Sequence, residues 1–161
     1  MKRIQDLDCD GLWLDNAMIQ EDPTSNQHIP EMILDRFGVK NWKGLYFGGI
    51  AFKYQKPIQN LEFVLELAKK YVDVVVTSGD GTGIQIEKKK ICKFREMVKD
   101  NMLGLASGVT CENLVNLIKY ADVFIVGTYL ENFQGNVHEE HLVKMMKMFQ
   151  LYNEAYPLET L

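Results

Sequence analysis

The sequence predicts an α/β fold built from parallel strand–helix units. Five short apolar runs, rich in β-branched and small residues, alternate with stretches of helical periodicity. The spacing is about 30 residues per unit, which is typical of βαβ units. The later runs are almost continuously apolar, as in strands that are covered on both faces. Both observations favour a parallel sheet packed against helices.

The strands are expected at residues 11–18, 44–52, 73–79, 102–108 and 122–128. No linker or low-complexity segment separates these runs, so the sequence predicts one domain over residues 1–161. The intervening stretches carry apolar residues at helical spacing. Their expected inward faces are Leu61, Val64, Leu65 and Ala68; Ile91, Phe94, Met97 and Val98; Leu114, Leu117 and Ile118, with Thr110 as N-cap; and Leu142, Met145, Met146 and Phe149.

Composition excludes several classes of function. The net charge is −4 and charges of both signs are interspersed, which argues against nucleic acid or an anionic membrane surface as the main partner. No apolar run approaches the ~20 residues of a membrane span, and the first residues lack the apolar core of a signal peptide. We therefore expect a cytoplasmic protein without membrane insertion.

Metal and cofactor sites are not expected. Cys9, Cys92 and Cys111 are far apart, and the three histidines have no ligand spacing. The run "SGDGTG" at residues 78–83 follows a predicted strand, but it matches neither the dinucleotide fingerprint nor the phosphate loop of nucleoside triphosphatases.

Spacing alone leaves two architectures open. The chain could form an open doubly wound sheet, or a (β/α) barrel of TIM type that lacks its first three units and is thus incomplete at its N-terminus. Both architectures place the functional site at the carboxyl ends of the strands.

The predicted strand ends carry polar and glycine residues suited to such a site. Two successive strands end in small-residue turns, and glycine there lets an anion approach backbone N–H groups. Lys53 ends an otherwise apolar strand, which favours a role in a polar site. The candidate residues are Asp15 and Asn16; Lys53; Thr77, Ser78 and Gly79; Ser107 and Gly108; and Gly127 and Thr128.

These motifs resemble those of one known family. "VDVVVTSGDGTG" and "LGLASGVTCENLVNLIKYADVFIVGTYL" are similar to the C-terminal half of the BtpA/SgcQ family of TIM-barrel proteins. "GLWLDNAM" and "YFGGIAFKYQKP" resemble two earlier strands of that family, so the resemblance runs from about residue 5 to residue 145. It implies a ribulose-phosphate-binding type of barrel, with these strands as the fourth to eighth.

The resemblance also assigns roles to the strand-end residues. Ser107, Gly108, Gly127 and Thr128 would bind phosphate, and Asn16, Thr77, Ser78 and Gly79 would line the same mouth. Asp15 and Lys53 are the candidate catalytic groups, for acid–base work or charge stabilisation. Whether the protein is an enzyme is left open.

Three functions follow from this reading. The first is a protein that binds a phosphorylated small molecule. Such a protein could be an enzyme that acts on a phosphosugar or a nucleotide-derived compound. The second is a non-catalytic assembly or stability factor, as for the member linked to photosystem I that gives the family its name. The third is an inactive truncated relic, because a whole barrel has about 250 residues. Two exposed sheet edges would also favour a homo-oligomer.

Overall fold

Five parallel strands form one curled sheet in the computed structural model, which describes residues 4–156. The strands follow one another in sequence order, β1-β2-β3-β4-β5, and each neighbouring pair is parallel. Their bounds are Gly11–Leu14 (β1), Leu45–Gly49 (β2), Val74–Ser78 (β3), Met102–Ala106 (β4) and Val123–Ile125 (β5). Each strand lies within its predicted range, and the residues left over at the carboxyl side form the strand-end loops.

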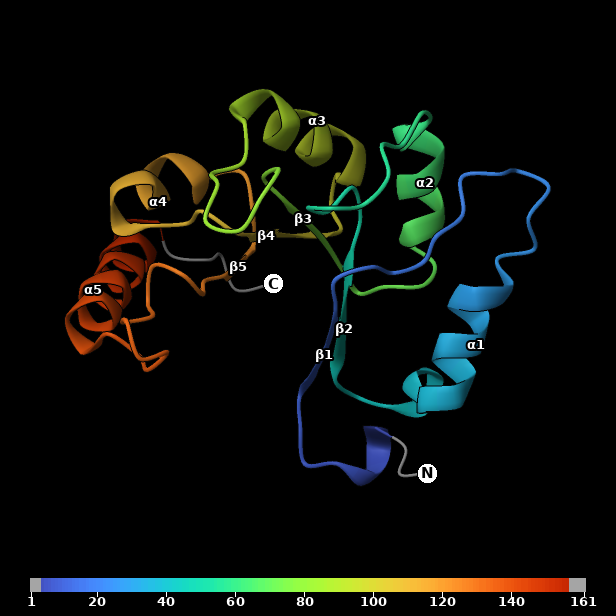
Figure 1. Ribbon diagram of the computed structural model, residues 1–161, viewed down its shortest axis with the longest axis horizontal. Coiled ribbons are helices and arrows are strands. Elements are labelled where there is room, and N and C mark those ends of the chain that lie inside the picture. The colour runs from blue at the N-terminus through green and yellow to red at the C-terminus, as the bar shows by residue number, and fades with distance from the viewer. Residues whose placement is uncertain (1–3, 157–161) are drawn as a thin grey trace.

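Five helices lie in an arc along the outer face of this sheet (Figure 1). They are α1 (His28–Phe37), α2 (Leu61–Ala68), α3 (Lys88–Val98), α4 (Cys111–Leu117) and α5 (Glu139–Ala155), with short 3-10 turns at Ile4–Asp6 (η1) and Val39–Asn41 (η2). Within residues 4–156, none of these helices combines the length and the apolar character that spanning a membrane requires.

The two faces of the sheet carry two separate apolar clusters. Leu103 and Leu105 point outward and are fully buried against helix residues such as Phe94. The inner cluster consists of Phe52, Val74, Val76 and Ala106, packed against further strand side chains. Burial on both faces explains why the central strands are almost continuously apolar.

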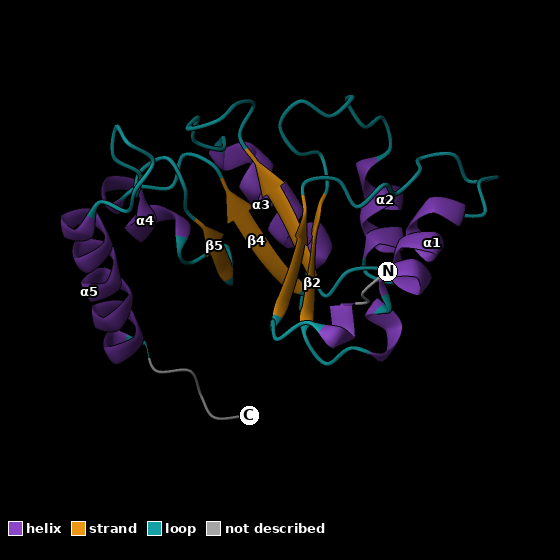
Figure 2. Cartoon of the chain, turned by 60° about the horizontal axis from the view of Figure 1, so that its bottom comes forward, coloured by secondary structure: helices purple, strands orange, loops and turns teal. Residues whose placement is uncertain are grey.

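The predicted fold class is therefore confirmed, as a curled part of a (β/α) barrel. A doubly wound sheet reverses its strand order at a switch point and has helices on both faces. Here the order is sequential, and Figure 2 shows the described helices on the outer side of the strands. This arrangement brings the five carboxyl ends, and the loops that follow them, to one rim.

Two aspartates fix the opposite, amino-terminal edge of the sheet. The Asp73 carboxylate, just before β3, accepts a hydrogen bond from the backbone N–H of Tyr46 in β2 at 2.8 Å. Asp122, just before β5, accepts one from Leu103 in β4 at 2.8 Å and also pairs with Arg95. A carboxylate that accepts a backbone N–H holds each strand in register with its neighbour.

Helix α4 begins as the sequence predicts. Thr110 is its N-cap, and the Asn113 side chain accepts a hydrogen bond from the Thr110 backbone N–H at 2.9 Å. The predicted inward residues Leu114 and Leu117 are buried. This cap fixes the direction of the chain as it leaves β4.

The expected inward face of α5 was partly wrong. Met145 is 3% exposed and Phe149 packs on Phe124 with ring centroids 5.7 Å apart, but Leu142 and Met146 are 38% and 59% exposed. The helix packs on the barrel through a narrow stripe, so only part of its apolar surface is covered.

The neighbouring methionines of α5 provide a matched stability test. Met145→Ala is expected to lower the free energy of unfolding by about 2 to 3 kcal/mol, because a buried methionine side chain is replaced by a cavity. Met146→Ala should change it by less than about 0.5 kcal/mol, since that side chain is exposed. Urea unfolding of both variants measures the difference, and equal losses would contradict the observed packing of α5.

Candidate functional site

The strand-end loops enclose a pocket of about 270 Å³ at the rim. It brings together six of the residues singled out from the sequence: Asp15, Lys53, Ser107, Gly108, Gly127 and Thr128. Its other lining residues are Trp13, Phe52, Thr82, Gly83, Ala106, Val109, Thr110, Ile125, Val126 and Tyr129. Polar groups from the loops after β1, β2, β3, β4 and β5 thus converge on one space.

The turn after β4 has an unusual backbone. Ser107 and Gly108 both have positive φ, at 71° and 64°. A non-glycine residue such as Ser107 with positive φ is strained by about 1 to 3 kcal/mol of conformational free energy. Backbone strain of this kind is common at ligand sites. The Asn113 side chain donates to the Gly108 carbonyl at 2.7 Å and to the Gln85 side chain at 3.1 Å, which ties this turn to α4 and to the loop before α3.

The turn after β5 forms the adjacent wall. The Leu130 N–H donates to the Gly127 carbonyl at 2.7 Å, which closes the turn. A Cβ built on Gly127 would have only Glu131 Oε1 within 4 Å, at 3.9 Å. Gly127 is exposed and lines the pocket, and the space beside its Cα is open.

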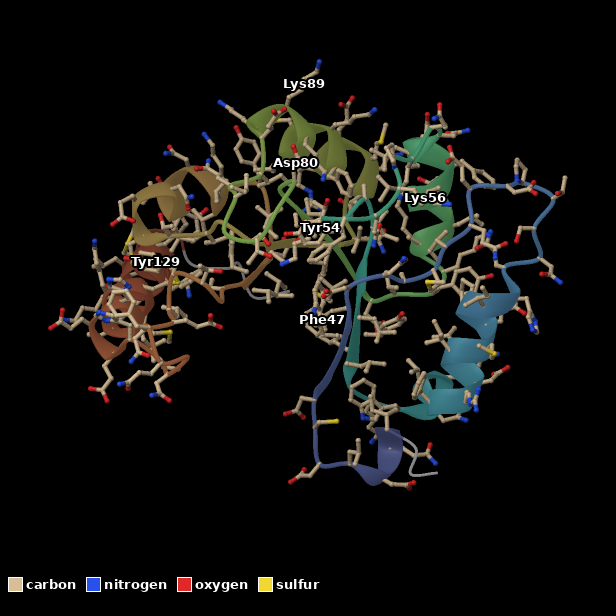
Figure 3. All side chains as sticks on the ribbon, viewed as in Figure 1. Phe47, Tyr54, Lys56, Asp80, Lys89 and Tyr129 are labelled. Carbon is tan, nitrogen blue, oxygen red and sulfur yellow. The ribbon has the colours of Figure 1, made fainter. Side chains whose placement is uncertain are left out.

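Lys53 is held by the loop that follows β3. Its backbone N–H donates to Ser78 Oγ at 2.7 Å, and its ammonium Nζ donates to Thr82 Oγ1 at 3.2 Å. Tyr54, labelled in Figure 3, follows Lys53 in the same loop and hydrogen-bonds the same threonine. Hydrogen bonds from Thr82, with the charge of Lys53, lower the pKa of Tyr54. The β2 and β3 loops therefore close one side of the pocket together.

The "SGDGTG" segment spans the mouth between two other loops. Thr82 accepts a hydrogen bond from the Lys53 ammonium. A Cβ added at Gly83 would lie 3.6 Å from Cγ2 of Thr128, which follows β5. Gly79 and Asp80 border a neighbouring hollow rather than the main pocket. Within this segment, Thr82 and Gly83 form part of the pocket wall.

Thr77 and Ser78 are fully buried and do not border the pocket. The Thr77 hydroxyl donates to the Ala51 carbonyl at 3.4 Å, and the Ser78 hydroxyl donates to the Gly79 carbonyl at 2.8 Å. Asn16 is exposed outside the pocket and accepts from the Met18 N–H at 2.8 Å. The structure brings none of these three into contact with the pocket, and their role in binding stays a prediction.

Lys90 was not among the candidate residues singled out from the sequence. Its ammonium donates to the carbonyls of Ala51 and Ser78, both at 2.7 Å, and burial lowers its pKa. Lys90 thus joins the carboxyl ends of β2 and β3. The available signal was its position four residues before Phe94, on the buried face of α3.

Beyond Thr128 the pocket wall continues into a stack of rings. His141 of α5 stacks on Tyr129 with centroids 4.4 Å apart, and on His138 at 4.0 Å. Within residues 4–156, no group of three or more histidine, cysteine or carboxylate side chains has the arrangement of a metal site. Both histidines are half-buried in this stack.

The fold is that of a partial (β/α) barrel, with a pocket at the carboxyl ends of its strands. The model of the BtpA family matches residues 47–153, and the chain belongs to that family. The match includes Lys53 and both glycine turns, whereas Asp15 and Asn16 precede it.

Two curated relatives match part of the chain. An uncharacterised protein of Archaeoglobus fulgidus is 29% identical over 106 residues, which cover 65% of this chain and 42% of the relative. An uncharacterised protein of Thermococcus kodakarensis is 32% identical over 92 residues, or 57% of this chain and 35% of the relative. The matched part of the chain spans less than half the length of either relative.

Proposed function

We propose that the rim pocket binds a phosphorylated small molecule, with its phosphate at the turns Ser107–Gly108 and Gly127–Thr128. The observation that carries this proposal is the meeting of two strand-end turns in one pocket, one of them with consecutive positive φ angles. Successive backbone N–H groups in such turns form a concave site for anions. Lys53 adds a positive charge on the same pocket.

Lys53 and Asp15 would act on the remainder of the ligand. The Lys53 ammonium bonds only a neutral hydroxyl in the side-chain contacts described, so its charge is available to an incoming anion. Asp15 is exposed at the end of β1 and lines the same pocket, where its carboxylate accepts hydrogen bonds or a proton. This pair supports an enzyme acting on a phosphosugar or a nucleotide-derived compound.

The second candidate is a non-catalytic assembly or stability factor. The observation in its favour is the exposed apolar surface of α5, where Leu142, Val143 and Met146 are 38%, 51% and 59% exposed. Exposed apolar groups of this kind also suit self-association. The polar rim pocket, however, has no part in such a role, which places this candidate second.

Calorimetric titration with ribose 5-phosphate tests the phosphate proposal, with ribose as the unphosphorylated control. Binding of the phosphate ester alone is expected. Lys53→Met should weaken it about ten- to hundredfold, since a hydrogen bond to a charged group contributes about 1.5 to 3 kcal/mol. The control Lys56→Met removes an exposed lysine outside the pocket and should bind like the wild type.

A folded sample that binds neither ribose 5-phosphate nor any other sugar phosphate in a thermal-shift screen would contradict the proposal. Equal weakening by the two lysine variants would show that only the general charge of this loop matters.

A further inference from the structure

The floor of the rim pocket is aromatic, in contrast to its polar walls. Trp13 of β1 and Phe52 line it from the inner face of the sheet, together with Ala106 and Ile125. The Trp13 and Phe52 rings meet edge to face, with centroids 5.4 Å apart and planes at 68°. A phosphate bound at the turns after β4 and β5 would not need this apolar surface, because an anion is bound by polar N–H groups and cations.

The Trp13 ring is held in a fixed relation to the polar groups. Phe52 is 5% exposed, and the Lys53 ammonium lies over its ring, 5.6 Å from the ring centroid. The Gln55 side chain accepts from the Phe52 N–H at 3.1 Å and donates to the Asp15 carbonyl at 2.7 Å. The β2 loop is thereby bonded to the chain two residues after Trp13, which restrains the floor and both candidate catalytic groups together.

Trp13 is also more open than a core residue of this face. Phe52, Val76 and Ala106 are at most 5% exposed, whereas Trp13 is half-buried and borders the pocket. An indole side chain facing a pocket offers a flat apolar surface for a second ring. Sites with a polar end and an apolar end select ligands that have both.

We propose that the ligand is a phosphate ester that carries a planar unsaturated ring, as a nucleoside 5′-monophosphate does, and that this ring binds against Trp13. The inference rests on the proposed phosphate site and adds the class of the ligand. Stacking of a nucleobase on an aromatic side chain contributes about 1 to 3 kcal/mol. A sugar phosphate without a base would leave the aromatic floor in contact with water.

Comparison of three phosphate esters tests this inference. Ribose 5-phosphate, uridine 5′-monophosphate and adenosine 5′-monophosphate share a phosphorylated ribose. The first has no base, and the other two carry a pyrimidine and a purine. At least one nucleotide is expected to bind about tenfold or more tightly than ribose 5-phosphate, as measured by calorimetry. In a Trp42→Phe background Trp13 is the sole tryptophan, and the nucleotide should change its fluorescence.

Variants of the two tryptophans separate the contribution of the base to the affinity from that of the phosphate. Trp13→Leu should abolish the preference for the nucleotide while ribose 5-phosphate binds within about twofold of the wild-type affinity. Trp42→Leu is the matched control, since Trp42 precedes β2 at the other end of the sheet.

Each outcome has a distinct meaning. Equal affinity of the wild type for all three esters would overturn the inference and leave the phosphate site standing. Binding of none of them, with no sugar phosphate binding in the thermal-shift screen, would overturn both proposals. A preference for a nucleotide that survives Trp13→Leu would assign the base to another part of the pocket and overturn the role of Trp13. If Trp13→Leu fails to fold, an unchanged Trp13 fluorescence on nucleotide binding in the Trp42→Phe protein would overturn that role as well.

Discussion

Gly127→Val is expected to weaken binding of ribose 5-phosphate by about 100-fold or more without destabilising the protein. Gly127 lines the pocket, and its backbone lies beside the proposed phosphate position. Valine adds bulk at a residue that lines the pocket, next to the turn whose N–H groups are proposed to bind the anion. The fold has room for the substitution, because a Cβ at this position meets one atom within 4 Å, Glu131 Oε1 at 3.9 Å.

The free energy of unfolding of Gly127→Val should stay within about 1 kcal/mol of the wild type, which urea unfolding measures. Titration with ribose 5-phosphate measures the affinity. The affinity of Gly127→Ala should lie between those of Gly127→Val and the wild type. Unchanged affinity in a folded Gly127→Val protein would remove the turn after β5 from the phosphate site.

Gly108 is less suited to this experiment, although it lines the same pocket. Its φ is +64°, and a Cβ there would lie 2.3 Å from the backbone nitrogen of Gln85. A substitution would therefore disturb the turn itself, so a loss of binding would not distinguish a blocked site from a damaged one.

The location of the pocket was predictable because parallel strands end at one rim. Asp15, Lys53 and the two glycine turns follow different strands in the sequence, and the structure brings all of them to one pocket. The direction of the last side chains of a strand was not predictable to the same accuracy. Thr77 and Ser78 lie inside the expected strand range, but both are buried and donate to the carbonyls of Ala51 and Gly79 instead of bordering the pocket.

The aromatic floor was overlooked, although a signal for it was present. Residues two apart on a strand point to the same face, so Trp13 has the orientation of Asp15. Asp15 was expected at the site, whereas Trp13 was expected only as part of an apolar strand. The partner ring, Phe52, could not be inferred, because its contact with Trp13 depends on the path of the loop after β2.

The apolar residues of α5 show a different limit. Their spacing predicts a face of a helix, but it does not say how much of that face a neighbour covers. Met145 is buried and Met146 is exposed because the sheet meets α5 along one stripe. The width of that contact depends on the curvature of the whole sheet.

Gly49→Ala is expected to lower the free energy of unfolding by about 3 kcal/mol, the upper part of the usual range for overpacking. A Cβ at Gly49 would lie 2.0 Å from the Asp15 carbonyl oxygen and 2.5 Å from its carbonyl carbon. Both are backbone atoms, so no side-chain rotation relieves the clash. The chain at the end of β1 has to move away from β2.

That movement would also break the contacts that position the candidate catalytic carboxylate. The Gly49 carbonyl accepts from the Ala17 N–H at 3.1 Å, and Gln55 bonds the Asp15 carbonyl at 2.7 Å. Gly49→Ala should therefore weaken ligand binding as well as stability, whereas Gly127→Ala has space for its methyl group and should leave stability unchanged. Urea unfolding of the two alanine variants separates these effects. A loss below about 1 kcal/mol for Gly49→Ala would mean that the end of β1 shifts freely, because overpacking of a rigid site costs at least that much. In that case the backbone next to β2 does not fix Asp15, and its place in the pocket depends on the ligand.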